Sequence, residues 1–268
     1  MTYKNTGKKK ESNSRLRHSS IVFSVLNIKI STFILLFTCG KLAYASCLSD
    51  YDKIIKQRYP RDSTQAHVSY CKIWPATGHI ILATSIKNVD TTDLEILVLD
   101  SKTGKVIAET QEIDALDYGA IFSDRLIIDT AHYRLNASLL AFGIRISWRG
   151  FSQPNPYSAE TLNLYIVKDS KLIKVLNGLS VYESTGEWDL MCKGKFITTN
   201  TLVHMRHLQK GYSHMLLKKT FERSESQMTN NGCETTIAPS KSERYTLYFE
   251  NDKYTVPRDL SSHISSSE

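Results

Sequence analysis

The chain has 268 residues, of which 41% are hydrophobic and 23% charged, enough to bury the core of one large domain or two small ones. Residues 1–45 hold eight Lys or Arg and one acid, and this excess of +7 equals the net charge of the whole chain. The totals of 34 basic and 27 acidic residues therefore leave 26 of each in residues 46–268. The isoelectric point near 9.0 therefore comes from residues 1–45 and not from a nucleic-acid-binding surface on the rest of the chain.

An apolar run, Ile30 to Cys39, follows the basic residues. Its length of about ten residues matches a signal-peptide core and is too short to span a bilayer. Ala43-Tyr44-Ala45 then supplies the small-x-small pattern of a processing site. Residues 1–45 are therefore expected to be a signal peptide and the mature chain to begin at Ser46. This predicts a periplasmic or secreted bacterial protein.

Two alternatives keep the chain at a membrane. Ile21 to Cys39 could act as an uncleaved anchor, but Lys29 lies in its middle, and a charge near the bilayer centre costs about 2.5–3.5 kcal/mol. Ala45-Ser46-Cys47 resembles the end of a lipoprotein processing box, although Tyr44 fits that box poorly. Membrane contact is thus expected only through an uncleaved leader or a lipidated Cys47.

The cysteines support export. Cleavage of the leader removes Cys39 and leaves an even set, Cys47, Cys71, Cys192 and Cys233, as suits an oxidising compartment. Four cysteines allow three pairings. The sequence-local pairing joins Cys47 with Cys71 and Cys192 with Cys233, and each bridge would stabilise the fold by about 3–4 kcal/mol in the loop-entropy model. None of the spacings is C-x-x-C, so neither a zinc ribbon nor a redox dithiol is indicated.

Residues 46–268 contain no Pro- or Gly-rich linker, which predicts a single domain. Its first element is a short helix over Ser49 to Tyr59, capped by Ser49 and ended by Pro60. From His79 onward, short β-branched runs alternate with period two, as strands do. The expected strands are His79 to Ile86, Leu94 to Leu99, Lys105 to Glu109, Arg125 to Asp129, Phe142 to Trp148, Asn163 to Val167, Leu172 to Leu176, Leu179 to Glu183, Phe196 to Leu208, Tyr212 to Glu222 and Tyr245 to Phe249.

Turn sequences separate these strands. Asp100 to Gly104 suits a type I turn with a glycine bulge, while Lys168 to Lys171 and Asn251 to Lys253 suit tight hairpin loops. Short strands joined by hairpins predict an all-β fold, either an antiparallel sandwich or a propeller-like array of hairpins, with the one short N-terminal helix.

Catalytic motifs are scarce. The sequence has no G-x-S-x-G elbow, no H-E-x-x-H and no glycine-rich phosphate loop. If Lys210-Gly211 centres a hairpin, His207 and His214 face each other across it while His204 points to the other face. Two histidines without a third local ligand fall short of a zinc site, so no metal and no cofactor are expected.

A second candidate site surrounds Trp188. Glu187 and Asp189 flank this Trp, and the group could form a sugar-binding platform or an acid and base pair. The alternative is that Trp188 packs over the disulfide of Cys192 while both carboxylates lie in solvent.

The third candidate is the aperiodic loop from Arg149 to Ser158. Phe151 and Tyr157 beside two prolines are plausible contacts for a partner, because loops on rigid β scaffolds often carry recognition. The alternative is that Asn155-Pro156-Tyr157 only sets a bend into the next strand.

Four blocks of sequence resemble a family of exported bacterial proteins of unknown function, over about Cys71 to Pro257. They are Cys71 to Ala76, Asp129 to Leu135 with Ala141 to Gly143, Asn155 to Tyr157 with Leu162 to Tyr165, and Gly186 to Asp189 with Cys192. The resemblance implies a bacterial, exported, single-domain protein and carries no activity.

Two hypotheses of function follow. The first is a non-catalytic envelope protein that binds another protein or an envelope polymer, for example an inhibitor or immunity protein against an envelope-degrading enzyme. Its expected contact residues are Phe151, Tyr157, Glu187, Trp188 and Asp189. The second is an envelope hydrolase or carbohydrate-active domain that uses Glu187 and Asp189.

Overall fold

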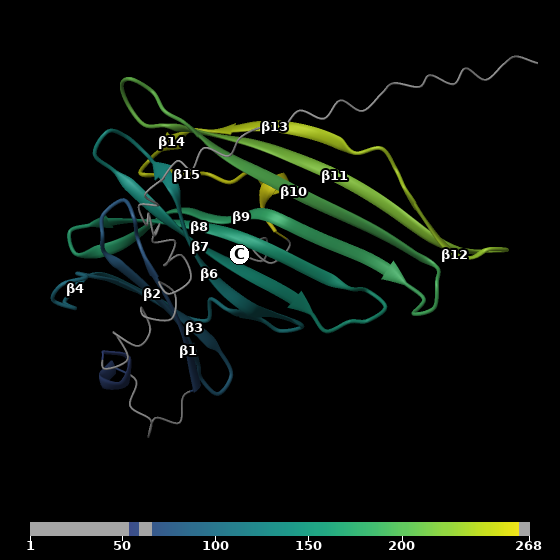
Figure 1. The fold of residues 1–268 in the computed structure, drawn as a ribbon, viewed down its shortest axis with the longest axis horizontal. Coiled ribbons are helices and arrows are strands. Elements are labelled where there is room, and N and C mark those ends of the chain that lie inside the picture. Colours follow the sequence, from purple (N-terminus) through teal and green to yellow (C-terminus); the bar gives the residue numbers. More distant parts are fainter. Residues whose placement is uncertain (1–53, 59–65, 263–268) are drawn as a thin grey trace, which may run out of the picture. The chain divides into compact units, whose positions relative to one another are not determined.

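The computed structural model describes residues 54–58 and 66–262. The predicted signal peptide, the start at Ser46 and Cys47 lie outside the described residues. The all-β prediction is confirmed: strands dominate the described part of the chain and join one large sheet (Figure 1). The strands are β1 (Ala66–Ile73), β2 (Ile80–Lys87), β3 (Thr92–Leu99), β4 (Val106–Glu112), β5 (Asp117–Tyr118), β6 (Ile121–Arg134), β7 (Leu140–Gly150), β8 (Tyr157–Lys168), β9 (Lys171–Trp188), β10 (Gly194–Arg206), β11 (His214–Thr229), β12 (Gly232–Ile237), β13 (Lys241–Leu247), β14 (Phe249–Glu250) and β15 (Lys253–Tyr254). A 3-10 turn, η1 (Arg258–Leu260), follows them.

The predicted short helix is present over residues 54–58, within the expected segment. Ile55 is buried in a small apolar cluster with Leu82 and Leu97. On the same helix the Arg58 guanidinium contacts Glu95 and Glu109, each at 2.6 Å. One buried apolar side chain and one ion-paired side chain thus join this helix to β2, β3 and β4.

The sheet is almost entirely antiparallel and branches at β9. Its main order is β1-β2-β3-β4-β9-β8-β7-β6-β5, while β10 and β11 continue from the second half of β9 and β12 and β13 both pair with β11. The parallel contacts are single pairs, Glu109 with Lys171 and Leu176 with Tyr254. One large, mostly antiparallel sheet therefore replaces the separate blades of a propeller.

β9 differs from its prediction. Two strands, Leu172 to Leu176 and Leu179 to Glu183, were expected, but the structure has one strand of 18 residues. Gly178 adopts a φ of 66° inside it, and the Gly178 N–H donates to Asn163 Oδ1 at 2.7 Å. The irregular residue keeps a hydrogen-bond partner, so the strand bends without ending.

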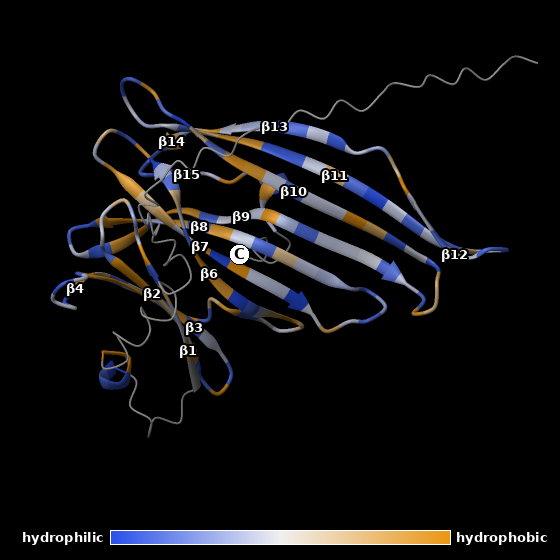
Figure 2. Ribbon diagram, viewed as in Figure 1, coloured by the Kyte–Doolittle hydropathy of each residue, from blue (hydrophilic) through white to orange (hydrophobic). Residues whose placement is uncertain are grey.

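Two apolar cores lie on opposite faces of β7, β8 and β9. The first packs β2, β3 and β4 against β6, β7 and β8 and includes Phe142 and Tyr165, whose rings lie 5.8 Å apart. The second includes Leu162 and Leu164 and is closed by residues of β11, β13 and η1. Because both faces are covered here, β8 is buried without a break from Thr161 to Ile166, whereas β9 to β11 become polar along their length (Figure 2).

The predicted turns are confirmed. Asp100 accepts the Thr103 N–H at 2.7 Å and Gly104 has a φ of 69° between β3 and β4. Asp169 and Ser170 have φ values of 51° and 60°, as a two-residue hairpin turn between paired Lys168 and Lys171 requires.

Four strands were not predicted: the longer β1 and β12, and the two-residue strands β5 and β15. Of the longer two, β1 pairs with β2 and β12 pairs with β11. The β12 side chains are exposed apart from Gly232. An edge strand without a buried face carries no apolar period of two, so the sequence pattern gave no indication of it.

Candidate functional site

A groove of 740 Å³ lies where the loop between β7 and β8 meets the end of β9 and the start of β10. Phe151, Tyr157 and Trp188, which the sequence proposed as contact residues in two separate segments, all line it. Phe196, Ser158 and Ser184 complete much of the wall. The fold thus brings the second and third candidate sites together.

Backbone hydrogen bonds hold the 151–156 loop against β9. The Trp188 N–H donates to the Pro154 carbonyl at 2.8 Å, and the Gly186 N–H donates to the Pro156 carbonyl at 3.1 Å. Pro154 and Pro156 have no N–H to donate, but their carbonyl groups can accept hydrogen bonds from β9. The Asn155 N–H donates to Ser152 Oγ at 3.1 Å and closes the turn. This loop is therefore a well-anchored edge of the groove.

Phe151 is presented on a second aromatic ring. Its side chain is 70% exposed, and its ring stacks on Phe122 of β6 with centroids 4.5 Å apart and planes 25° apart. Stacking on Phe122 restricts the orientation of the Phe151 ring and leaves its other face in solvent.

Phe196 lies flat on the sheet because two glycines leave room for it. A Cβ at Gly186, directly opposite on β9, would lie 2.4 Å from Phe196 Cδ1. A Cβ at Gly194 would lie 2.9 Å from the Cε2 atom at the other edge of the ring. One ring face therefore covers both glycines and the other faces away from the sheet. Sequence analysis missed Phe196, although the flanking Gly186 and Gly194 were a usable indication.

Tyr157 has a structural role besides lining the groove. It packs against the first core, and its hydroxyl donates to Glu183 Oε1 at 2.9 Å. Burial, and then the adjacent Glu183 carboxylate, raise the pKa of Tyr157. Tyr157 pairs with Thr185, so its side chain leaves the sheet on the face opposite Ser184.

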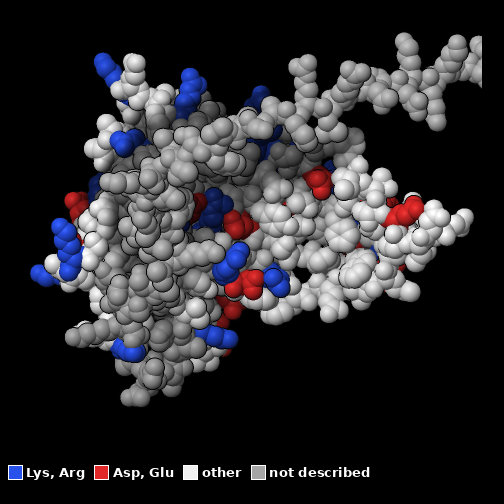
Figure 3. Space-filling model, viewed as in Figure 1, with Lys and Arg blue, Asp and Glu red and all other residues white. Residues whose placement is uncertain are grey.

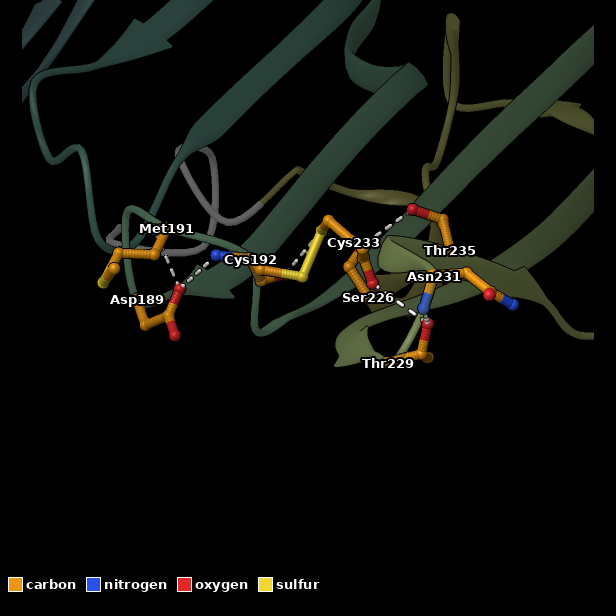
Figure 4. The surroundings of a disulfide bond; sticks show 9 residues. Asp189, Met191, Cys192, Ser226, Thr229, Asn231, Cys233 and Thr235 are labelled. Carbon is orange, nitrogen blue, oxygen red and sulfur yellow. Dashed lines mark hydrogen bonds between the residues drawn. A yellow bond between two sulfur atoms is a disulfide. The ribbon is translucent and has the colours of Figure 1, made fainter.

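The two carboxylates beside Trp188 have different surroundings. Asp189 Oδ1 accepts the N–H groups of Met191 and Cys192, both at 2.9 Å, which closes the turn between β9 and β10 (Figure 4). The hydrogen bond from the Met191 N–H is the main reason why the pKa of the Asp189 carboxyl group is lowered. Glu187 is opposite Lys195 and one position from Trp188, so it points to the other face of the sheet.

The disulfide between Cys192 and Cys233 confirms one predicted pairing. Their Cα atoms lie 5.6 Å apart, and the bridge joins the β9–β10 turn to the start of β12 (Figure 4). Cys71 is also disulfide-bonded. Its predicted partner, Cys47, is outside the described residues. Trp188 itself is 39% exposed and lines the groove, so its ring is not buried in a core.

A second hollow, of 630 Å³, contains a cluster of charged and polar groups. Arg145 bonds Asp129 at 2.7 Å through Nε and Glu160 at 2.9 Å through Nη1, and the Tyr133 hydroxyl donates to Asp129 at 2.8 Å. Burial opposes ionisation of Asp129, but hydrogen bonds from the Ala131 N–H, Arg145 and Tyr133 outweigh it and lower the pKa of Asp129. Sequence analysis missed this cluster.

The histidine prediction needs correction. His214 lies opposite Arg206, not His207, because residues 207–213 form a wider loop with Gly211 at a φ of 85°. His207 Nδ1 contacts Ser213 Oγ at 3.0 Å, and the His214 ring meets Tyr248 edge-on at 4.7 Å. The described residues contain no group of three or more metal-ligating side chains.

No family model, curated protein or solved structure matches the chain. The resemblance to exported bacterial proteins therefore stays a prediction. Within residues 54–58 and 66–262, no helix is long and apolar enough to cross a membrane.

Proposed function

We propose that this chain is a non-catalytic binding protein of the bacterial cell envelope, and that the groove at Phe151, Trp188 and Phe196 is its binding surface. One observation carries the proposal. Three aromatic rings from separate parts of the sequence surround a single groove, and two of them, Phe151 and Trp188, are exposed at 70% and 39%. Exposed aromatic residues gathered in a concave surface are typical of binding sites, where Trp in particular contributes strongly to affinity.

The surface is rigid, which favours binding. The backbone of the loop is hydrogen-bonded to β9, Phe151 rests on Phe122, and Asp189 and the disulfide hold the neighbouring turn. A preorganised surface loses little conformational entropy when a partner binds. Among the described residues that line this groove, Arg149 alone is charged, and it is paired with Asp124 at 3.1 Å. The groove itself therefore does not favour a strongly charged partner, and basic and acidic side chains both occur on the face shown in Figure 3.

Location in the envelope rests on the leader and is testable on its own. Expressed from its full coding sequence in a Gram-negative bacterium, the protein is expected in the periplasmic fraction with Ser46 at its N-terminus, because Ala43-Tyr44-Ala45 suits signal peptidase. Intact mass and N-terminal sequencing of the purified protein measure this. Retention of residues 1–45, or a diacylglyceryl group on Cys47, would contradict cleavage at this site.

The binding surface can be tested by site-specific crosslinking. A photoreactive phenylalanine analogue at Phe151 is expected to form a discrete adduct in envelope extracts, while the same analogue at Tyr248, which is 54% exposed elsewhere, is not. Trp188→Ala should weaken the Phe151 adduct, because removal of an interface anchor costs about 2 kcal/mol or more. Identical adduct patterns at both positions, or an adduct insensitive to Trp188→Ala, would contradict the assigned surface.

A further inference from the structure

The face of the sheet that carries the groove continues past Ser184. Ser158, Ser184 and Thr198 form a row across β8, β9 and β10, and Glu160, Tyr182 and Asn200 form the next row, two positions along each strand. Paired residues share a face and residues two apart return to it, so both rows lie on the face that carries Trp188 and Phe196. Ser158, Ser184 and those rings line the 740 Å³ groove, and the second row lines the 630 Å³ hollow.

The two hollows therefore lie on one face of β8, β9 and β10, in neighbouring rows, and we name them together the trough, which we define by Trp188, Phe196, Ser184, Tyr182 and Glu160. Six residues of β9 separate Trp188 from Tyr182, a length of roughly 20 Å at about 3.3 Å per residue. Figure 1 shows β8, β9 and β10 running side by side along this stretch. A trough of this length suits an extended polymer better than a compact small molecule.

The chemistry changes along the trough. At one end the free face of Phe196 and the exposed Trp188 offer apolar ring surfaces. In the middle, Ser184 and Thr198 share one hydrogen bond at 3.3 Å, and a hydroxyl pair of this kind keeps a donor and several lone pairs for a ligand.

At the other end Glu160 accepts Arg145 at 2.9 Å through one carboxylate oxygen. A carboxylate has about four acceptor positions, so further hydroxyl donors can bind there. The neighbouring Tyr182 and Asn200 side chains add neutral hydrogen-bonding groups to this end of the trough.

Resting on the proposed function, we infer that this trough binds a linear, hydroxyl-rich glycan chain. Sugar rings present apolar C–H faces that stack on aromatic rings and hydroxyls that both donate and accept hydrogen bonds. The aromatic end and the hydroxyl rows provide these two kinds of contact in sequence. Arg145 pairs with both Asp129 at 2.7 Å and Glu160 at 2.9 Å, and an ion-paired carboxylate is a poor general acid for glycoside hydrolysis, so we expect the glycan to be bound without cleavage.

Tryptophan fluorescence provides a specific measurement. Of the three tryptophans, Trp74 and Trp148 are 3% and 4% exposed, whereas Trp188 is 39% exposed. Titration with pentasaccharides of N-acetylglucosamine, glucose in β-1,4 linkage and glucose in α-1,4 linkage is expected to change the Trp188 emission with at least one of them. Calorimetry on the same samples gives the affinity, and chromatography checks that the pentasaccharide stays intact.

Three variants locate the site. We expect Trp188→Ala to weaken pentasaccharide binding at least tenfold in calorimetry. We expect the same of Ser184→Phe, because the larger side chain fills the middle of the trough. Tyr248→Ala removes an exposed aromatic outside the trough and should leave the affinity unchanged. Thermal unfolding of each variant shows whether the fold is retained.

The results separate the two proposals. Binding that both trough variants weaken supports the glycan. If no pentasaccharide binds while the Phe151 crosslink captures a protein, the glycan inference is wrong and the proposed function stands. If pentasaccharides bind the wild type and both trough variants equally, the trough is not the site and the inference is wrong. Cleavage of a bound pentasaccharide would instead show an enzyme and contradict both.

Discussion

Replacing both Cys192 and Cys233 with serine is expected to lower the free energy of unfolding by about 4 kcal/mol. The bridge spans 41 residues, and a crosslink over a loop of this size removes about that much entropy from the unfolded chain. The double variant is preferable to a reducing agent, because Cys71 is disulfide-bonded as well. Urea unfolding of wild type and variant under identical conditions measures the difference.

A matched control comes from the same hairpin. Ser226→Ala removes the Ser226–Thr235 hydroxyl contact of 2.9 Å between β11 and β12 and should cost less than about 1 kcal/mol because the site is exposed. Hydrogen exchange in the double-serine variant should increase first in residues 189–193 and 232–237, which the bridge joins. A loss of under about 1 kcal/mol, equal to the control, would mean that the bridge does not restrain the unfolded chain as its span predicts.

Arg145→Leu is expected to lower the free energy of unfolding by about 3 kcal/mol at pH 7. Arg145, Asp129 and Glu160 are 27%, 14% and 21% exposed, so loss of the cation leaves two poorly solvated carboxylates facing each other. Removing one member of a buried ion pair costs about 3–5 kcal/mol, and the partial exposure places this case at the lower end. Arg149→Leu is the control, since Arg149 and Asp124 are 64% and 45% exposed and their pair should contribute under about 1 kcal/mol.

The Arg145 effect should depend on pH. The folded-state pKa of Asp129 lies below its unfolded value, so ionised Asp129 stabilises the wild type above about pH 4, and this contribution is lost as the pH falls through the folded pKa. The gap between wild type and Arg145→Leu should therefore narrow on acidification below about pH 4. A gap that stays constant from pH 7 to pH 3 would show that Arg145 acts by packing its methylenes rather than through its charge.

The sequence by itself determined the local features of this protein. Alternation of apolar and polar residues identified most central strands, because those strands are buried on at least one face, as β2 and β3 are. Asp100 to Gly104 and Lys168 to Lys171 predicted turns through their own backbone preferences. The even cysteine count predicted disulfides, and the sequence-local choice among three pairings joined Cys192 with Cys233. Each of these properties depends on residues that are neighbours in the chain or on a simple count.

Only the tertiary structure decided which faces and which distant residues meet. Tyr157 and Ser158 are adjacent in sequence and both line the groove, yet the pleat turns Tyr157 toward the first core and Ser158 to the opposite face of the sheet. Phe196 became a flat platform because Gly186, on another strand, lies directly beneath its ring. Arg145 meets Asp129 and Glu160 through strand register across β6, β7 and β8. Register is set by the packing of both cores at once, and a residue's place in such packing cannot be derived from its own neighbours in the sequence.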